Sequence, residues 1–277
     1  MDICLTIAEV RAARAKAKLV GLVPTMGALH AGHVSLVRMA KLQTEVVSAS
    51  IFVNPKQFGP NEDYSRYPRS FERDCDMLEK EGVSFVFAPN VDEMYPPGGD
   101  TWVAVEGMSG KLDGRSRPGH FRGVTTVVSK LFNIVQPQKA FFGQKDAAQL
   151  AIIRRMVRDL NIPIEIVGCA IVREPDGLAL SSRNAYLDAQ QRKSALVLHR
   201  SLLRMEEMFN AGESDAEVLI AAGKKVMEEE AGARLDYLEV ADPDSLDPLR
   251  RIDQSALAAV AAYVGTTRLI DNLLLNP

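Results

Sequence analysis

The chain has 277 residues, of which 47% are hydrophobic and 25% are charged, and its formal net charge at pH 7 is −3. These values are typical of a globular protein with one large or two modest domains. The slightly acidic charge argues against a nucleic-acid partner, because proteins that grip a nucleic-acid backbone usually carry a basic face.

The N-terminus and the cysteines indicate where such a protein works. Residues Met1 to Cys4 lack the basic and apolar regions of a signal peptide, and no apolar stretch approaches ~20 residues. We therefore expect a cytoplasmic protein without a membrane partner. Cys4, Cys75 and Cys169 are widely spaced and form no CxxC pair, which predicts reduced thiols and neither disulfides nor a zinc site.

In the first two thirds of the chain, apolar β-rich runs alternate with helical patterns. The expected strands are Leu19 to Val23, Val46 to Val53, Ser84 to Ala88, Lys139 to Phe142 and Ile164 to Val167, and the expected helices are Gly32 to Leu42, Ser70 to Glu81, Gly123 to Val135 and Asp146 to Leu160. This alternation predicts an α/β fold with a Rossmann-like parallel sheet and helices on both faces. Ligands of such sheets bind beyond the carboxyl ends of the strands.

The segment from Val23 to His33 joins a strand, a glycine turn and a helix start. Gly27 and Gly32 let the backbone approach a ligand closely, and the helix that begins near Gly32 directs its N-terminal amides at that ligand. His30 and His33 lie three residues apart and share one helix face, so both can donate to one polyphosphate. The segment therefore predicts a nucleotide phosphate site.

Other interpretations of this segment are an ordinary helix entry with a solvated histidine and a metal pair. The HxxH spacing lacks the carboxylate of zinc proteases, and the glycines match neither the GxGxxG fingerprint nor a P-loop. The HxGH type of nucleotidyl transfer site remains, in which the ATP α-phosphate is attacked and pyrophosphate leaves.

Polar residues also follow the expected strand Val46 to Val53 and lie in the first turn of the expected helix Asp146 to Leu160. Asn54 to Phe58 and Gln149 carry neutral hydrogen-bonding groups that suit a small polar substrate. A basic, glycine-containing loop over residues 114–123 can cover an anion, although a solvated charge run also explains it. Its basic residues are Arg115, Arg117, His120 and Arg122.

Two more segments suit phosphate. Gly143 to Asp146 opens a helix after a strand, so its amides and the Lys145 ammonium can meet a phosphate; a plain helix start capped by Asp146 is the alternative. Ser181 to Asn184 follows a hairpin pattern over Ile171 to Leu180. Its hydroxyls and guanidinium suit a triphosphate, but a plain domain linker explains them as well.

After residue 184 the pattern changes to two charged amphipathic helices followed by strands. The helices are Ala189 to Asn210 and Asp215 to Ala231, and the strands are Leu235 to Ala241, Ala256 to Val264 and Thr267 to Leu274, the last two joined by a tight Gly265-Thr266 turn. We therefore expect a Rossmann-like domain over residues 1–184 and a smaller α+β domain, with helices and an antiparallel sheet, over residues 185–277.

Five ordered motifs, PTMGALHAGH, IFVNPKQF, RPGHFRGV, FFGQKDAAQL and GLALSSRNAYL, resemble the pantothenate synthetase (pantoate–β-alanine ligase) family along nearly the whole chain. The resemblance implies a ligase of pantothenate and coenzyme A biosynthesis. ATP and pantoate would give pantoyl adenylate and pyrophosphate, and β-alanine would then attack the adenylate and release pantothenate and AMP.

The resemblance also implies a role for individual residues. His33 would be a proton donor, with His30 and Lys145 as further catalytic groups. Gln57 and Gln149 would hold pantoate, with Asn54, Arg117 and His120 also near the substrates. The implied ATP site comprises Met26, Gly27, Ala28, Leu29, His30, Ala31, Gly32, His33, Gly143, Gln144, Lys145, Asp146, Val172, Leu180, Ser181, Ser182 and Arg183.

The family further implies a homodimer formed by the N-terminal domain. Phosphoryl-transfer chemistry calls for Mg²⁺ on the ATP phosphates, and a reactive acyl adenylate must be shielded from water, so we expect the C-terminal domain to close over the ATP site as a lid. Two rival functions stay open. Another HxGH nucleotidylyltransferase would yield a dinucleotide-like product, and a noncatalytic nucleotide-binding regulator would bind ATP without turnover.

Overall fold

The computed structural model describes residues 1–15, 17–60 and 62–277 and divides into two compact units. Unit 1 comprises Met1–Ser109, Arg117–Gly143 and Ile152–Ala170, and unit 2 comprises Gly110–Ser116, Gln144–Ala151 and Ile171–Pro277. The two units are defined by the contacts within each of them, and such contacts do not show which segments fold independently. The domain division at residue 184 therefore stays a prediction. Within the described ranges, no helix is both long and apolar enough to cross a bilayer.

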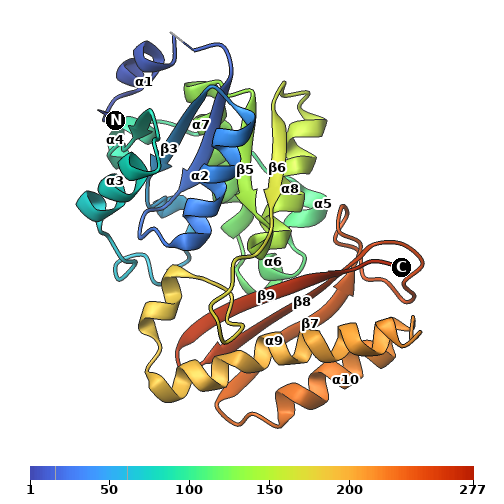
Figure 1. The fold of residues 1–277 in the computed structure, drawn as a ribbon. Coiled ribbons are helices and arrows are strands. Elements are labelled where there is room, and N and C mark those ends of the chain that lie inside the picture. The colour runs from blue at the N-terminus through green and yellow to red at the C-terminus, as the bar shows by residue number, and fades with distance from the viewer. Residues whose placement is uncertain (16, 61) are drawn as a thin grey trace. The chain divides into compact units, whose positions relative to one another are not determined.

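Unit 1 contains a six-stranded sheet in the order β1-β4-β3-β2-β5-β6, with every neighbouring pair parallel. This arrangement confirms the predicted parallel α/β fold (Figure 1). Because the strand order reverses between β2 and β5, their carboxyl ends form the switch point at which such sheets bind ligands. The strands are β1 (Asp2–Cys4), β2 (Val20–Thr25), β3 (Val46–Ile51), β4 (Phe85–Phe87), β5 (Lys139–Gly143) and β6 (Glu165–Cys169).

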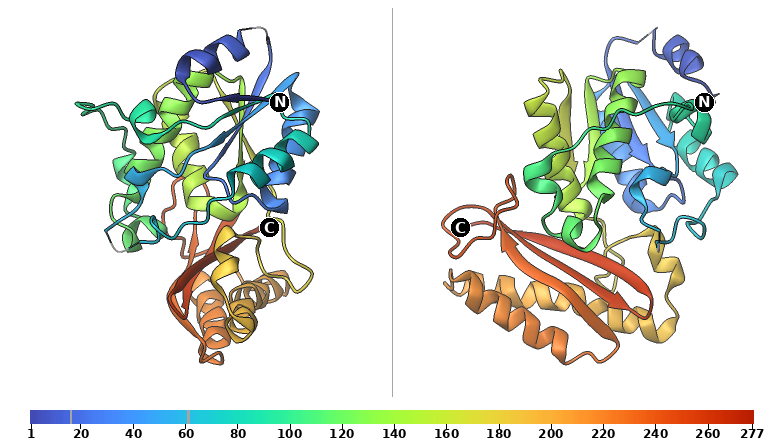
Figure 2. Two further views of the ribbon diagram at one scale, coloured as in Figure 1. Left: turned by 90° about the vertical axis from the view of Figure 1, so that its left-hand side faces the viewer. Right: turned by 180° about the vertical axis from the view of Figure 1, so that it is seen from behind.

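Helices cover both faces of this sheet (Figure 2). One face carries α2 (Ala31–Gln43), whose apolar side is buried, and α3 (Phe71–Lys80). The other carries α1 (Ile7–Arg14), α7 (His120–Val135) and the unit 1 part of α8 (Ala147–Asp159), and α7 touches both of its neighbours. The short elements of unit 1 are η1 (Pro55–Gln57), α4 (Val91–Met94) and α5 (Glu106–Ser109).

The prediction of a continuous loop over residues 114–123 is wrong, because much of this segment is helical. Residues Asp113–Ser116 form α6, and α7 begins at His120, three residues before the expected start at Gly123. Gly119, with φ 82°, reverses the chain immediately before α7. Glycine weakens isolated helices, which is why the sequence favoured a start at Gly123, but tertiary packing keeps this glycine inside the helix.

Unit 2 contains an antiparallel sheet in the order β7-β8-β9, and α9 and α10 pack on it. Val264 pairs with Thr267, so the predicted Gly265-Thr266 turn is confirmed. The expected hairpin over Ile171 to Leu180 has a single bridge, between Arg173 and Ala179, and forms no longer strands in this described segment. The elements are β7 (Ala233–Ala241), β8 (Ala256–Val264), β9 (Thr267–Leu275), α9 (Ala189–Asn210), α10 (Ala216–Glu228), α6, η2 (Gln144–Asp146) and η3 (Ser182–Tyr186).

Candidate active site

The glycine turn after β2 is closed by a carboxylate from α3. Gly27 and Ala28 have φ values of 80° and 50°, and this left-handed turn presents successive amides. The N–H groups of Ala28 and Leu29 donate to the two carboxylate oxygens of Asp74, at 2.8 and 2.9 Å. Asp74 is only 1% exposed and also accepts from the Ser70 hydroxyl. An internal carboxylate therefore binds the amides of the glycine turn, which precede the N-terminal amides of α2 that the sequence suggested for a phosphate.

The two histidines of the HxGH segment are held by backbone amides at the start of α2. His30 Nδ1 accepts from the Gly32 N–H at 3.1 Å, and His33 Nδ1 accepts from the His30 N–H at 3.3 Å. Since an accepting Nδ1 carries no proton, each neutral ring has its proton on Nε2. The ring centroids lie 4.1 Å apart. The segment thus carries two neighbouring imidazoles with Nε2–H donors, the type of donor that binds polyphosphate oxygens.

A second cluster of unit 1 surrounds the loop after β3. Asn54 is 1% exposed and Gln57 is 8% exposed, and Asn54 Nδ2 donates to Gln57 Oε1 at 3.0 Å. Gln57 Nε2 in turn donates to Met26 Sδ at 3.1 Å. The structure therefore brings the predicted substrate residues Asn54 and Gln57 together with Met26 of the predicted ATP segment.

Arg117 and His120 form a chain of hydrogen bonds to this loop. The Arg117 guanidinium binds the Glu62 carboxylate through two hydrogen bonds. Its Nη1 lies 3.0 Å from His120 Nε2, and His120 Nδ1 lies 2.8 Å from the Gln57 carbonyl oxygen. Because the guanidinium only donates and the carbonyl only accepts, His120 is neutral with its proton on Nδ1. Both residues thus position Gln57, in addition to any contact with ATP.

The same hydrogen bonds from Arg117 affect the pKa of Glu62. Burial alone would raise the pKa of this carboxyl, but the hydrogen bonds and the positive charge of Arg117 lower the pKa below its ordinary value. Glu62 is therefore ionised at neutral pH and neutralises the Arg117 guanidinium.

In unit 2, the predicted ATP loop is fastened to β9. The side-chain amide of Asn272, only 2% exposed, donates to the carbonyl oxygens of Gln144 and Lys145 at 3.0 and 2.9 Å. The Lys145 ammonium lies 3.8 Å from the Asp146 carboxylate. Gln149 is half-buried, one helical turn after Lys145. Predicted residues of this segment therefore share one anchored loop and helix start.

The hairpin and the serine loop of unit 2 are also held in place. Val172 and Leu180 are paired through a hydrogen bond from the Leu180 N–H to the Val172 carbonyl. Arg173, beside them, binds Asp271 of β9 through two hydrogen bonds of 2.6 and 2.9 Å. Ser181 caps η3, which contains Ser182 and Arg183, by accepting from the Arg183 N–H.

Three residues that hold these segments were not predicted: Asp74, Asn272 and Tyr95, whose hydroxyl donates to Asn54. Each is a single polar residue in an ordinary helix, strand or loop pattern, far along the chain from its partners. The sequence offered one weak signal, a lone Asp-Asn pair inside the mainly apolar β9.

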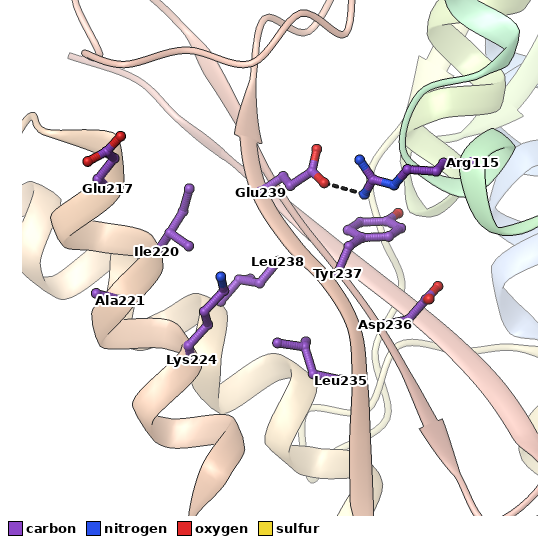
Figure 3. A pocket seen from close by; sticks show the side chains of 10 residues that line it. All are labelled: Arg115, Glu217, Ile220, Ala221, Lys224, Leu235, Asp236, Tyr237, Leu238 and Glu239. Carbon is purple, nitrogen blue, oxygen red and sulfur yellow. Dashed lines mark hydrogen bonds and ion pairs between the residues drawn. The ribbon is translucent and has the colours of Figure 1, made fainter.

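A cavity within unit 2 has a volume of about 560 Å³, and none of the residues predicted for ATP or pantoate lines it (Figure 3). It lies between α10 and β7, where Arg115 meets Glu239. Within the described ranges, no group of three or more His, Cys, Asp or Glu side chains could hold a metal ion.

Comparisons with known proteins agree with the motifs. The family model described as pantoate-beta-alanine ligase matches residues 2–274. The pantothenate synthetase of Koribacter versatilis is 61% identical, over 100% of this chain and 96% of the relative. A pantothenate synthetase structure from Thermus thermophilus has a TM-score of 0.97 at 50% identity, with both chains fully covered. A Francisella tularensis pantoate-beta-alanine ligase, complexed with beta-gamma ATP and beta-alanine, has a TM-score of 0.79 at 35% identity, covering 99% and 97%.

Proposed function

The chain belongs to the pantoate-beta-alanine ligase family, and from that premise we propose that it uses ATP to join pantoate and β-alanine, releasing AMP and pyrophosphate. The observation that carries this proposal is the pair of imidazoles whose Nδ1 atoms accept backbone N–H groups, in a segment whose Met26 also accepts from the buried Gln57 amide. The ligands of the Francisella relative, ATP and β-alanine, support the same substrates for this chain.

In the first step, a carboxylate oxygen of pantoate attacks the α-phosphorus of ATP and the bond to the β-phosphate oxygen breaks. This reaction needs alignment and neutralisation of charge more than covalent help. The Nε2–H groups of His30 and His33 donate to phosphate oxygens, and the Lys145 ammonium and the Arg183 guanidinium neutralise charge. The His33 Nε2–H group donates a hydrogen bond to the departing pyrophosphate.

In the second step, the uncharged amine of β-alanine attacks the acyl carbon of pantoyl adenylate. The carbon–oxygen bond to AMP breaks and the amine nitrogen loses a proton, which leaves the amide of pantothenate. The acyl group is already activated, so the protein mainly excludes water and keeps the acyl group in place. Gln57 and Gln149 hold the pantoyl group for this purpose.

Mg²⁺ is part of the proposal as a partner of ATP. Mg²⁺ is usually held by substrate phosphates, water and one or two carboxylates, so it needs no dedicated cage of protein ligands for this role. Asp146, half exposed beside Lys145, is the carboxylate of the ATP loop that would hold it. When bound, Mg²⁺ would neutralise phosphate charge.

We also propose a cytoplasmic homodimer whose C-terminal domain acts as a lid. Cys4, Cys75 and Cys169 are buried and unbridged, which fits a reducing compartment. The dimer rests on the family alone. The lid rests on chemistry, because a reactive acyl adenylate must be shielded from water.

Mass spectrometry of a mixture of ATP, pantoate and β-alanine tests the reaction directly. We expect AMP and pantothenate, and pantoate-dependent exchange of pyrophosphate into ATP without β-alanine. A dinucleotide-like product would instead identify a nucleotidylyltransferase, and ATP binding without turnover would identify a regulator. Synthesis of pantothenate without pyrophosphate exchange above the pantoate-free control would contradict a reversible adenylate step.

A further inference from the structure

The side-chain amide of Asn54 has no hydrogen-bonding capacity left for a substrate. Its two N–H groups donate to Gln57 Oε1 at 3.0 Å and to the Gly123 carbonyl at 3.1 Å. Its oxygen accepts from the Tyr95 hydroxyl at 2.9 Å and from the Lys56 N–H at 3.2 Å. A carboxamide has two donors and two acceptor sites, so all four are used. Asn54 therefore acts on a ligand through its neighbours.

Tyr95 supplies one of these four contacts from a distant segment, at the end of α4. Its ring lies 6.1 Å from the Phe52 ring, and the Lys56 ammonium lies 4.3 Å from its centroid. Burial raises the pKa of the phenol, so the hydroxyl stays protonated and remains a donor. Packing and a cation–π contact thus hold a hydroxyl donor against the Asn54 oxygen.

The orientation of Asn54 decides the orientation of Gln57. Because Asn54 presents Nδ2 to Gln57, the Gln57 side chain must turn its oxygen inward and its Nε2 toward Met26. The thioether sulfur of Met26 is a weak acceptor that a substrate oxygen can replace. The Gln57 backbone is fixed separately, through the hydrogen bond from His120 to its carbonyl.

We propose that Tyr95 is a positioning residue that, through Asn54, fixes Gln57 as a hydrogen-bond donor and so selects a substrate with an acceptor oxygen at that point. The inference rests on the proposed function, in which that oxygen belongs to the carboxylate or a hydroxyl of pantoate. Tyr95 itself touches no substrate. Reversing the Asn54 amide would turn the Gln57 oxygen toward the substrate and oppose a carboxylate.

The test compares Tyr95→Phe, which removes one oxygen atom, with the matched control Tyr263→Phe on β8 of unit 2. We expect the KM for pantoate to rise by about 5- to 30-fold in Tyr95→Phe, the range for one lost hydrogen-bond partner. The KM for ATP and the melting temperature should stay within error of those of the control. An unchanged KM for pantoate, or equal rises for pantoate and ATP, would overturn the proposal.

A double-mutant cycle distinguishes action through Gln57 from an independent contact. If Tyr95 works through Gln57, adding Tyr95→Phe to Gln57→Ala should not raise the KM for pantoate further. Multiplicative effects of the two changes would refute the relay. The wild-type enzyme assayed alongside reports on the function itself, because a wild type without pantothenate synthesis would contradict the proposed reaction and not the relay.

Discussion

In the proposed function, each imidazole of the HxGH segment has two tasks, one for each ring nitrogen. Nδ1 of His30 caps α2 and Nδ1 of His33 accepts from the His30 amide, so the backbone sets the tautomer of both rings. The Nε2–H groups are then oriented before any nucleotide arrives. Preorganised donors of this kind stabilise developing charge without reorganisation during the reaction.

The two tasks of His30 can be separated by mutation. His30→Asn retains an N-cap acceptor and should leave the melting temperature nearly unchanged, whereas His30→Ala should cost about 1 kcal/mol of stability. Both variants lose Nε2–H and should lower kcat by on the order of 10²-fold, as should His33→Ala. Thermal melts and steady-state kinetics check both halves. Near-normal kcat in His30→Asn would withdraw the phosphate-binding role of His30.

The ion pair between Glu62 and Arg117 leads to a second prediction, about how the stability of the protein depends on pH. The folded-state pKa of Glu62 is lowered, so its stabilisation is present above the unfolded value of about 4.3 and is lost as the pH falls through the lower folded pKa. The pair is partly exposed, so we expect about 1 kcal/mol or less. Glu62→Gln should be less stable than the wild type at pH 7, and this difference should shrink as the pH falls below about 4.3 toward the lowered folded-state pKa. A pH-independent difference in denaturant melts would contradict this origin.

At the scale of elements, a very close contact in unit 1 joins α7 to η1. A Cβ added at Gly123 would lie 2.1 Å from the Lys56 carbonyl oxygen and 2.6 Å from Gln57 Cα. Only a glycine permits this approach, and it allows the Gly123 carbonyl to accept from Asn54. The start of α7 therefore supports the loop after β3, which we propose holds pantoate.

Gly123→Ala should consequently weaken pantoate binding, because backbone on both sides of the contact must shift. Overpacking of this kind typically costs about 1–3 kcal/mol of stability. Calorimetric titration should show a weaker Kd for pantoate, while Gly107→Ala, where an added Cβ meets nothing within 4 Å, serves as the control. Wild-type affinity in Gly123→Ala would mean that the loop does not depend on this contact.

The helices and strands were largely predictable from the sequence, whereas the hydrogen bonds that connect distant segments were not. The strands β8 and β9 were foreseen because strong β patterns flank a two-residue turn, and α9 because its amphipathic pattern is long. The edge strand Asp2–Cys4 was missed because three residues carry too little pattern. The roles of Asp74 and Tyr95 left no sequence signal, and that of Asn272 left only a weak one, because a hydrogen bond between distant segments produces no periodicity.

At the scale of the molecule, the predicted site residues come from two units that are each internally ordered. Unit 1 supplies the histidines and Gln57, and unit 2 supplies Lys145, Gln149 and the serine loop. The proposed lid predicts that small-angle scattering will show compaction when an unreactive pantoyl-adenylate analogue is added. An unchanged profile with binding confirmed by calorimetry would contradict closure of the C-terminal domain.

The carboxylate of Asp74 has a consequence for the order of folding. It accepts from amides that lie 45 and 46 positions earlier in the chain, so these two hydrogen bonds form only once α3 has docked. Contacts across such a separation form late, because the entropy of closing the intervening loop must be overcome first. Under the proposed function, the nascent HxGH segment, although complete in sequence, should therefore bind nucleotide only after the long-range assembly of the sheet.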